Sequence, residues 1–190
     1  MKLGRTLYAK NRGEWRAWLA KHHQTTAEIW LIYYKKHSGK PRIPYNDAVE
    51  EALCFGWIDS ILKPIDASRY AQRFSPRRPT SRLSAMNRER VRRLIASGRM
   101  TKSGLERIRH VFDQRKDTKA RLRWEVPRDI LRRLKRDPTI WTNFQRFPES
   151  YKRIRIGWIA AARQRPDVFE QRLRYFVKMT AQNKRFGMVQ

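Results

Sequence analysis

Cysteine is almost absent from this chain, because Cys54 is the only one in 190 residues. A single cysteine excludes an internal disulfide and a zinc site built from several cysteines. No apolar run reaches the ~18 residues of a membrane-spanning helix. Residues 1–13 also lack the apolar segment of a secretory signal peptide. These absences predict a protein with no transmembrane segment and a cytoplasmic location.

Acidic residues are also scarce, with 17 Asp and Glu against 45 Lys and Arg, for a formal charge of +28. The excess is densest in residues 76–136, which hold 21 basic and 6 acidic residues. Hydrophobic residues still make up 40% of the chain, which is too many for a disordered polycation. We therefore expect a packed core and an anionic partner, either nucleic acid or an acidic protein. The alternative is that the charge only solvates the surface. Composition does not predict the oligomeric state.

The known nucleotide-binding motifs are missing as well. Neither the P-loop nor the dinucleotide-binding glycine pattern occurs, and Ser38-Gly39-Lys40 lacks the upstream glycine that a P-loop requires. The four histidines, His22, His23, His37 and His110, do not have metal-ligand spacing and are expected on the surface. The sequence therefore predicts no metal and no cofactor.

The first half of the chain mixes helix and strand patterns. Asn11 and Glu14 have capping-box spacing for a helix, and residues 28–35 are aromatic and β-branched, as in a covered strand. Residues 46–55 predict a second helix that ends at Gly56. Residues 57–76 then predict a β-hairpin.

The expected register of this hairpin pairs Lys63 with Arg69 and places Asp59 directly opposite Arg73. The two would then form an ion pair on the face that also carries Trp57 and Ile61. A shift of one residue would separate Asp59 from Arg73.

The second half of the chain has a helical pattern. Ser84 and Thr101 are expected to cap two helices, and four prolines stand where further short helices would begin: Pro127, Pro138, Pro148 and Pro166. The predicted fold class is α+β, a small antiparallel sheet of about three strands packed with helices and followed by a helical subdomain. The expected domains are an α+β domain at 1–112, a charged linker at 113–125 and a helical domain at 126–190.

Two residues are candidates for catalysis. Asp59 lies between bulky apolar neighbours, so burial could suit it to act as a general base with an arginine as anion clamp, although pairing with Arg73 would make it structural. Cys54 would need His37 or His110 beside it to be a nucleophile, and a small buried helix residue is the better interpretation.

The Arg-rich segment from Arg73 to Ser84 is the most unusual stretch of the sequence. Two prolines stiffen it, and its arginines and hydroxyls suit the oxygens of phosphate or carboxylate groups. The expected anion-binding residues are Arg73, Arg77, Arg78, Ser81, Ser84 and Asn87. Trp57, Asp59 and Phe74 are expected to form a pocket, and Arg88 and Arg92 a basic face. The alternative is a rigid loop whose arginines bind Glu50, Glu51 or backbone carbonyls.

Several blocks of the sequence resemble the bacteriocin-protection, YdeI or OmpD-associated family. The blocks are EWRAWL at 14–19, IWLIYYKK at 29–36, DAVEEALCFGWIDS at 47–60, RYAQRFSPRRPTSRLSAMNRERV at 69–91, GRMTKSGL at 98–105, and VPRDILRRL, DPTIWTNF, SYKRIRIGWIAAAR and NKRFGM in the last third. The resemblance implies protection against bacteriocins and cationic antimicrobial peptides and a link to outer-membrane porins, but no particular reaction. Leu83 stands where the family commonly has Trp, so a stacking role there is not expected.

Three functions remain open on this sequence. The first is a non-enzymatic stress-protection module whose Arg-rich segment binds an anionic partner. The second is a nucleic-acid-binding protein, which the charge and the interleaved aromatic residues favour. The third is an enzyme that uses Asp59 as its base.

Overall fold

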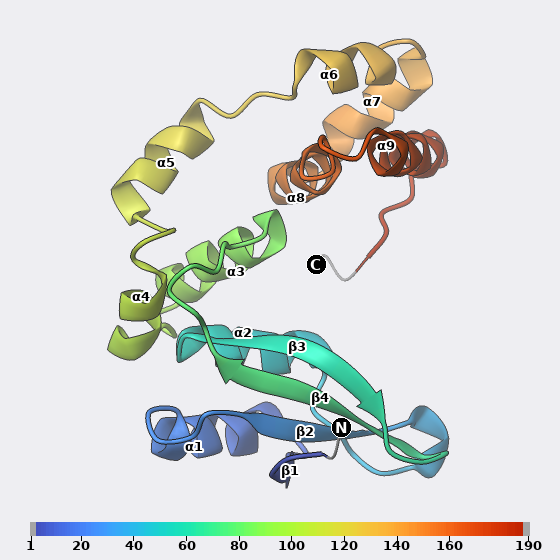
Figure 1. The fold of residues 1–190 in the computed structure, drawn as a ribbon. Coiled ribbons are helices and arrows are strands. Elements are labelled where there is room, and N and C mark those ends of the chain that lie inside the picture. Colours follow the sequence, from blue (N-terminus) through green and yellow to red (C-terminus); the bar gives the residue numbers. More distant parts are fainter. Residues whose placement is uncertain (1–2, 188–190) are drawn as a thin grey trace. The chain divides into compact units, whose positions relative to one another are not determined.

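The structure is a computed structural model that describes residues 3–187 and divides into two compact units. The first unit comprises the chain up to Arg82 together with Arg90–Phe112, and the second comprises Leu83–Glu89 and the chain from Asp113 onward. Residues 1–2 and 188–190, the ends of the domains expected at 1–112 and 126–190, lie outside the described residues. The first unit contains a sheet with helices and the second is helical, so the predicted α+β class is confirmed (Figure 1).

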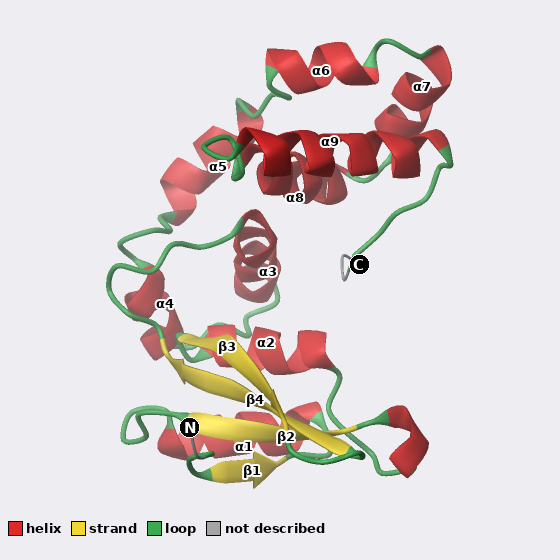
Figure 2. Ribbon diagram, turned by 45° about the vertical axis from the view of Figure 1, so that its right-hand side comes forward, coloured by secondary structure: helices red, strands yellow, loops and turns green. Residues whose placement is uncertain are grey.

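A single four-stranded sheet organises the first unit (Figure 2). Its strands are β1 (Thr6–Tyr8), β2 (Ile29–Tyr34), β3 (Trp57–Pro64) and β4 (Arg69–Pro76), in the order β1-β2-β4-β3. The hairpin β3–β4 and its pairing with β2 are antiparallel, whereas β1 pairs with β2 in parallel. The sheet therefore has one strand more than expected, because three residues are too short a run to show strand periodicity.

Helices α1 (Arg12–His22) and α2 (Tyr45–Cys54) pack against each other and against this sheet. The Asn11 side chain accepts the Glu14 amide at 3.0 Å, which is the predicted cap of α1. Trp15 reaches both partners, since its ring lies 5.3 Å from that of Phe74 and its indole N–H donates to the Ala48 carbonyl. Trp15 and Phe74 are fully buried, so this interface is the core of the unit.

A short 3-10 helix, η1 (Lys36–Ser38), follows β2.

The predicted register of the hairpin is wrong. Lys63 pairs with Ala71 rather than Arg69, and Asp59 lies opposite Phe74 rather than Arg73. A β-bulge between Asp59 and Leu62 inserts an extra residue into β3 and changes the pairing along the strand. The expected ion pair between Asp59 and Arg73 is therefore absent, and Ile61 is 45% exposed instead of sharing the buried face of Trp57.

Two helices after the hairpin begin at the predicted caps. Helix α3 (Ala85–Ala96) has the Ser84 hydroxyl accepting the Asn87 amide at 3.2 Å and is followed by Gly98 in the left-handed conformation. Helix α4 (Lys102–Ile108) is capped by Thr101.

The second unit is built from the remaining helices. They are α5 (Gln114–Leu122), α6 (Arg128–Leu134), α7 (Pro138–Arg146), α8 (Glu149–Ala160) and α9 (Pro166–Ala181). The last four begin at the four prolines, as predicted, and α5 occupies most of the segment expected as a linker. The core of this unit consists of Ile130, Leu134, Phe144, Phe147, Tyr151, Ile156, Ile159, Leu173 and Phe176. None of the helices in residues 3–187 has the length and apolar character to cross a membrane.

Candidate functional site

A cavity of about 560 Å³ lies in the first unit beside α4, and we call it the α4 cavity. Four parts of the chain wall it: the end of α1, the turn between α2 and β3, the loop after β4, and α4 with the residues that follow it. Its lining residues are His23, Gln24, Phe55, Trp57, Pro79, Ser103, Glu106, Arg107, Arg109 and His110. Trp57 is the member of the predicted pocket that lines this cavity, whereas Asp59 and Phe74 are not among its lining residues.

Helix α4 is fastened to the end of α2 through one carbonyl group. The Thr101 amide and hydroxyl both donate to the Cys54 carbonyl, at 3.1 and 2.6 Å. Gly104 permits this contact, because a Cβ atom there would lie 2.0 Å from the same oxygen. The Thr101 hydroxyl in turn accepts the Gly104 amide at 3.1 Å, which caps the helix. These contacts hold the cavity-lining side of α4 over the turn at Phe55.

The floor of the cavity is aromatic. Phe55 and Trp57 flank Gly56, which has a φ of +75° that other residues rarely adopt. A Cβ atom on Gly56 would lie 2.6 Å from the Arg107 side chain, so the glycine also makes room for that arginine. The Trp57 indole donates to the His23 carbonyl at 3.1 Å, which joins the floor to the end of α1.

The Arg-rich segment forms the wall that contains Pro79. Arg77 is 1% exposed, and its Nη1 donates to the Ser81 hydroxyl at 3.0 Å and to the Arg82 carbonyl at 3.1 Å. His110 contacts the Ser81 carbonyl through Nε2 at 3.3 Å, which ties the wall to the end of α4. Arg77 and Ser81 therefore shape the loop. For Arg77 the structure agrees with the alternative expectation, in which an arginine of the loop binds a backbone carbonyl of the same protein.

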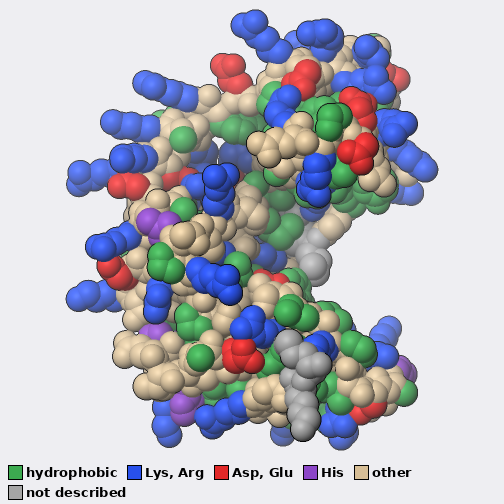
Figure 3. Space-filling model, in the orientation of Figure 1, with side chains coloured by type: hydrophobic (Ala, Val, Ile, Leu, Met, Phe, Trp, Pro, Cys, Tyr) green, Lys and Arg blue, Asp and Glu red, His purple; other side chains and the backbone are tan. Residues whose placement is uncertain are grey.

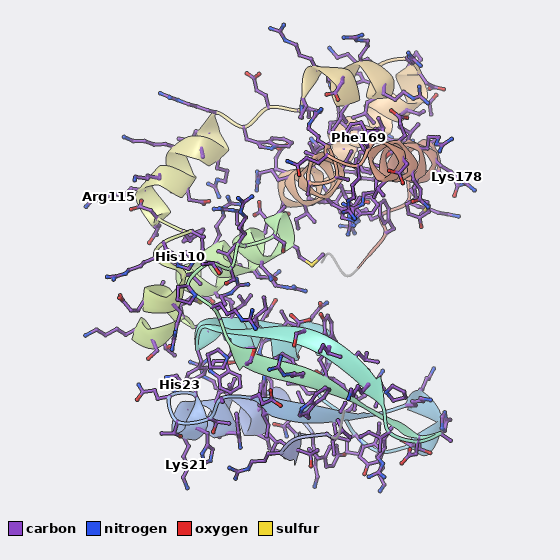
Figure 4. The ribbon with its side chains drawn as sticks, viewed as in Figure 1. Lys21, His23, His110, Arg115, Phe169 and Lys178 are labelled. Atoms are coloured by element: carbon purple, nitrogen blue, oxygen red, sulfur yellow. The ribbon has the colours of Figure 1, made fainter. Side chains whose placement is uncertain are left out.

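The rim of the cavity is basic. Arg107, Arg109 and His110 are exposed, and so is Arg78 beside Pro79. Glu106 is the one acidic lining residue, and Arg109 pairs with it at 3.0 Å. Arg107 and Arg78 have no acidic partner within ion-pair distance among residues 3–187. The rim thus keeps positive charge that is not neutralised within the unit. Figure 4 labels His23 and His110, which come from the end of α1 and the end of α4.

Arg73, a predicted anion-binding residue, is held by a carboxylate of its own chain. Its Nη2 and Nε lie 2.5 and 2.7 Å from Glu28 Oε2. This hydrogen bond to Arg73 lowers the pKa of the Glu28 carboxyl group below its usual range. Arg73 therefore stabilises the fold through an ion pair with Glu28, whereas the sequence predicted Asp59 as its partner.

Asp59 lies among hydroxyl and guanidinium groups of the same unit. The Tyr45 hydroxyl donates to its Oδ2 at 2.5 Å. Burial lowers the pKa of the Arg77 and Arg90 guanidinium groups, and the nearby Asp59 charge opposes that shift in both. Arg77 still has Nε and Nη2 buried without a hydrogen-bond partner, and the buried Tyr33 hydroxyl also has none. The Asp59 charge therefore favours the charged form of two buried arginines.

The other residues expected to bind anions are divided between the two units. Ser84 and Asn87 form the cap of α3 and belong to the second unit. Within that unit Arg88 lies 3.7 Å from Asp117. Arg92, expected on the same basic face, is half-buried in the first unit.

Cys54 is a core residue. Its side chain is fully buried, and burial raises the pKa of its thiol, which disfavours the thiolate that a nucleophile requires. His23, expected on the surface, is half-buried, with Nδ1 2.9 Å from the Leu19 carbonyl and its ring 5.0 Å from that of Phe55. In the part of the chain that is described, no three His, Cys, Asp or Glu side chains cluster closely enough to hold a metal ion.

Sequence reasoning did not identify most of the residues that line the α4 cavity. The sequence pattern predicts no role for Arg107, Arg109 and Ser103, and it predicts His110 only as a surface residue or as a partner for Cys54. One signal was available, because CFGWID and GRMTKSGL each place a glycine beside residues of the site. The two blocks belong to one site only because Gly104 lies against the Cys54 carbonyl, and this contact joins segments about fifty residues apart.

Comparison with known proteins gives two family matches. Residues 7–107, which make up 101 of the 190 residues, match a family described as a domain of unknown function, DUF8412. Residues 123–183 match the family described as bacteriocin-protection, YdeI or OmpD-associated, which confirms the family expected from the sequence over that range. The blocks quoted from 14–105 fall instead within the range of the first match. Neither the curated proteins nor the solved structures yielded a match. The chain therefore belongs to the DUF8412 family through its first half and carries a bacteriocin-protection, YdeI or OmpD-associated domain at residues 123–183.

Proposed function

We propose that this protein is a non-enzymatic module that binds an anionic partner, and that the α4 cavity is its binding site. The observation that carries the proposal is the combination of an unneutralised basic rim with an aromatic floor. Arg107 lines the cavity and supplies a guanidinium group suited to phosphate or carboxylate oxygens, and exposed Arg78 precedes the lining residue Pro79 in the chain. Phe55 and Trp57 are buried residues that line the apolar floor. The expected partner is an anion that also carries an apolar or aromatic group.

The Arg-rich segment still contributes to the proposed site, but its residues have different roles from those expected from the sequence. Arg77 and Ser81 build the wall of the cavity, and Arg78 presents its charge beside that wall. Arg73 is engaged by Glu28, so we do not assign it to the ligand. Catalysis by Asp59 is not included, because its carboxylate serves Tyr45 and two buried arginines.

The protective role in the description of the second matched family is compatible with such a module. Direct capture of a cationic antimicrobial peptide is disfavoured, since a chain of charge +28 repels a second polycation. A stress-protection function would therefore act through an anionic partner.

Phenyl phosphate is a suitable probe, because it joins a ring to a phosphate. We expect it to bind in the cavity more tightly than inorganic phosphate or benzyl alcohol, each of which offers one half of the interaction. Arg107→Gln should weaken binding about tenfold, equivalent to about 1.4 kcal/mol, by removing a charge-assisted hydrogen bond. Isothermal titration calorimetry gives the affinities, and NMR of the histidine and tryptophan side chains locates the site.

Arg5→Gln is the matched control, because Arg5 is exposed in the same unit and does not line the cavity. It removes the same charge and should leave the affinity unchanged. Equal weakening in both variants would show that binding follows overall charge. Probe signals that leave His23, His110 and Trp57 unmoved would place the anion elsewhere, and either result would contradict the proposal.

A further inference from the structure

Helix α5 of the second unit carries an exposed set of cations that we call the α5 basic face: Arg115, Lys116, Lys119 and Arg123. All four side chains are exposed, and none lies within ion-pair distance of a carboxylate in the described chain. Figure 3 shows Lys and Arg side chains projecting from the edge of the molecule where Figure 1 draws α5, and Figure 4 labels Arg115 there. This face is independent of the α4 cavity, which lies in the other unit.

One acidic residue, Asp113, interacts with the start of this face: backbone hydrogen bonds, with smaller contributions from the charges of Lys116 and Arg115, lower the pKa of its carboxyl group. Asp113 caps the helix by accepting the Lys116 amide at 2.8 Å. Asp117 is buried and lies 3.7 Å from Arg88. At 100° per residue, Asp117 projects on the side of α5 opposite to the α5 basic face. The four cations are therefore exposed along one side of the helix, and Arg121 is a further exposed cation on the side of Asp117.

The spacing of the cations follows the helix axis. Arg115, Lys119 and Arg123 are four residues apart, which places successive side chains ~6 Å apart along one side of the helix. Lys116 widens the same arc to ~100°. Such a row suits a partner with regularly repeated negative charges.

A membrane surface does not fit this helix. Interfacial helices bury a broad apolar face in the lipid, whereas the one large apolar side chain exposed on α5 is Leu122, at 78%. The sugar-phosphate backbone of nucleic acid repeats its charge at close, regular intervals and needs no apolar face. We propose that the α5 basic face binds the phosphate backbone of nucleic acid without reading its sequence.

The test compares the full-length protein with the triple variant Arg115→Gln, Lys119→Gln and Arg123→Gln. The probes are fluorescein-labelled 20-base-pair DNA and a 20-nucleotide oligouridine, followed by fluorescence anisotropy from 50 to 300 mM salt. For the duplex, removing three phosphate contacts should lower the slope of log affinity against log salt by about 2.7. Affinity at 100 mM salt should fall by about tenfold or more. Comparison of the two probes shows whether duplex or single strand is preferred.

A matched control removes three exposed cations from another part of the same unit: Arg174→Gln, Lys178→Gln and Lys184→Gln. Figure 4 labels Lys178 on α9. The control should keep at least half of the affinity and nearly all of the salt slope. Circular dichroism should be the same for all three proteins, since glutamine sustains a helix as well as lysine does.

Three outcomes would overturn the proposal. Equal losses in both triple variants would mean that nucleic acid responds only to total charge. Binding of a 20-residue polyglutamate peptide with the same affinity, and with the same loss in the α5 variant, would identify an acidic protein as the partner. A loss of nucleic-acid affinity with Arg107→Gln but not with the α5 triple variant would place nucleic acid in the α4 cavity. That result would contradict the present proposal without contradicting the proposed function.

Discussion

Gly104 is the residue on which the geometry of the α4 cavity most directly depends. Any side chain there would meet backbone atoms at the end of α2, with a Cβ atom 2.0 Å from the Cys54 oxygen and 2.7 Å from the Cys54 carbonyl carbon. A backbone neighbour cannot move aside as a flexible side chain can. We expect Gly104→Ala to lower the free energy of unfolding by about 1–3 kcal/mol or more.

Urea unfolding followed by tryptophan fluorescence would measure this change, with Lys102→Ala as control. Lys102 is exposed on the same helix, so its replacement should change stability by less than about 0.5 kcal/mol. If Gly104→Ala were as stable as the control, the close approach of α4 to α2 would be wrong.

At the scale of elements, α2 carries the charged network that joins the helices of the first unit. Glu51 is fully buried and receives Arg12 at 2.5 Å and Arg16 at 2.7 Å from α1, and it also pairs with Arg99. Glu50 binds Arg12 as well, at 2.5 Å. Glu50 and Glu51, the alternative partners expected for the Arg-rich segment, thus form ion pairs with arginines from other elements. Part of the excess of basic residues is therefore structural, because these arginines form ion pairs within the fold.

Removing the charge at the centre of this network should be costly. Glu51→Gln would leave several partly buried guanidinium groups without their carboxylate, and we expect a loss of about 3–5 kcal/mol. Glu149→Gln is the comparison, since Glu149 is 62% exposed in its pair with Lys152 and should change stability by less than about 1 kcal/mol. Similar unfolding midpoints in urea for the two variants would show that the network contributes little.

At the scale of the whole molecule, acid should destabilise both units. Hydrogen bonds from arginine lower the pKa of Glu28 in the first unit, through Arg73, and of Asp129 in the second, through Arg163. A carboxyl group with a lowered pKa in the folded state contributes its stability above its unfolded pKa of about 4. That contribution is lost as the pH falls through the folded-state pKa. Each pair is partly exposed, so each contributes about 1 kcal/mol at most.

Thermal unfolding between pH 7 and pH 2.5 would measure this loss. We expect a melting temperature that is level above about pH 5 and falls below about pH 4. The double variant Glu28→Gln, Asp129→Asn should start lower at neutral pH and fall less steeply in acid. A variant whose curve parallels that of the parent protein would show that these two pairs do not set the acid response.

The sequence by itself determined the fold class, the caps of α1, α3 and α4, the end of α2 at Gly56, and the four proline-led helices. These features are local, because each depends on a capping side chain, a left-handed glycine or a proline within one turn of the helix. The family of residues 123–183 could also be named from short blocks of sequence.

Only the tertiary structure decided the rest. The hairpin paired Lys63 with Ala71 instead of Arg69, and a bulge in β3 then set Asp59 opposite Phe74 rather than Arg73. Strand β1 was recognisable only through its pairing with β2. The α4 cavity exists because Gly104 meets the Cys54 carbonyl across about fifty residues of chain. Register, long-range packing and the partner that each arginine finds depend on atoms distant in sequence, and local periodicity carries no information about those distances.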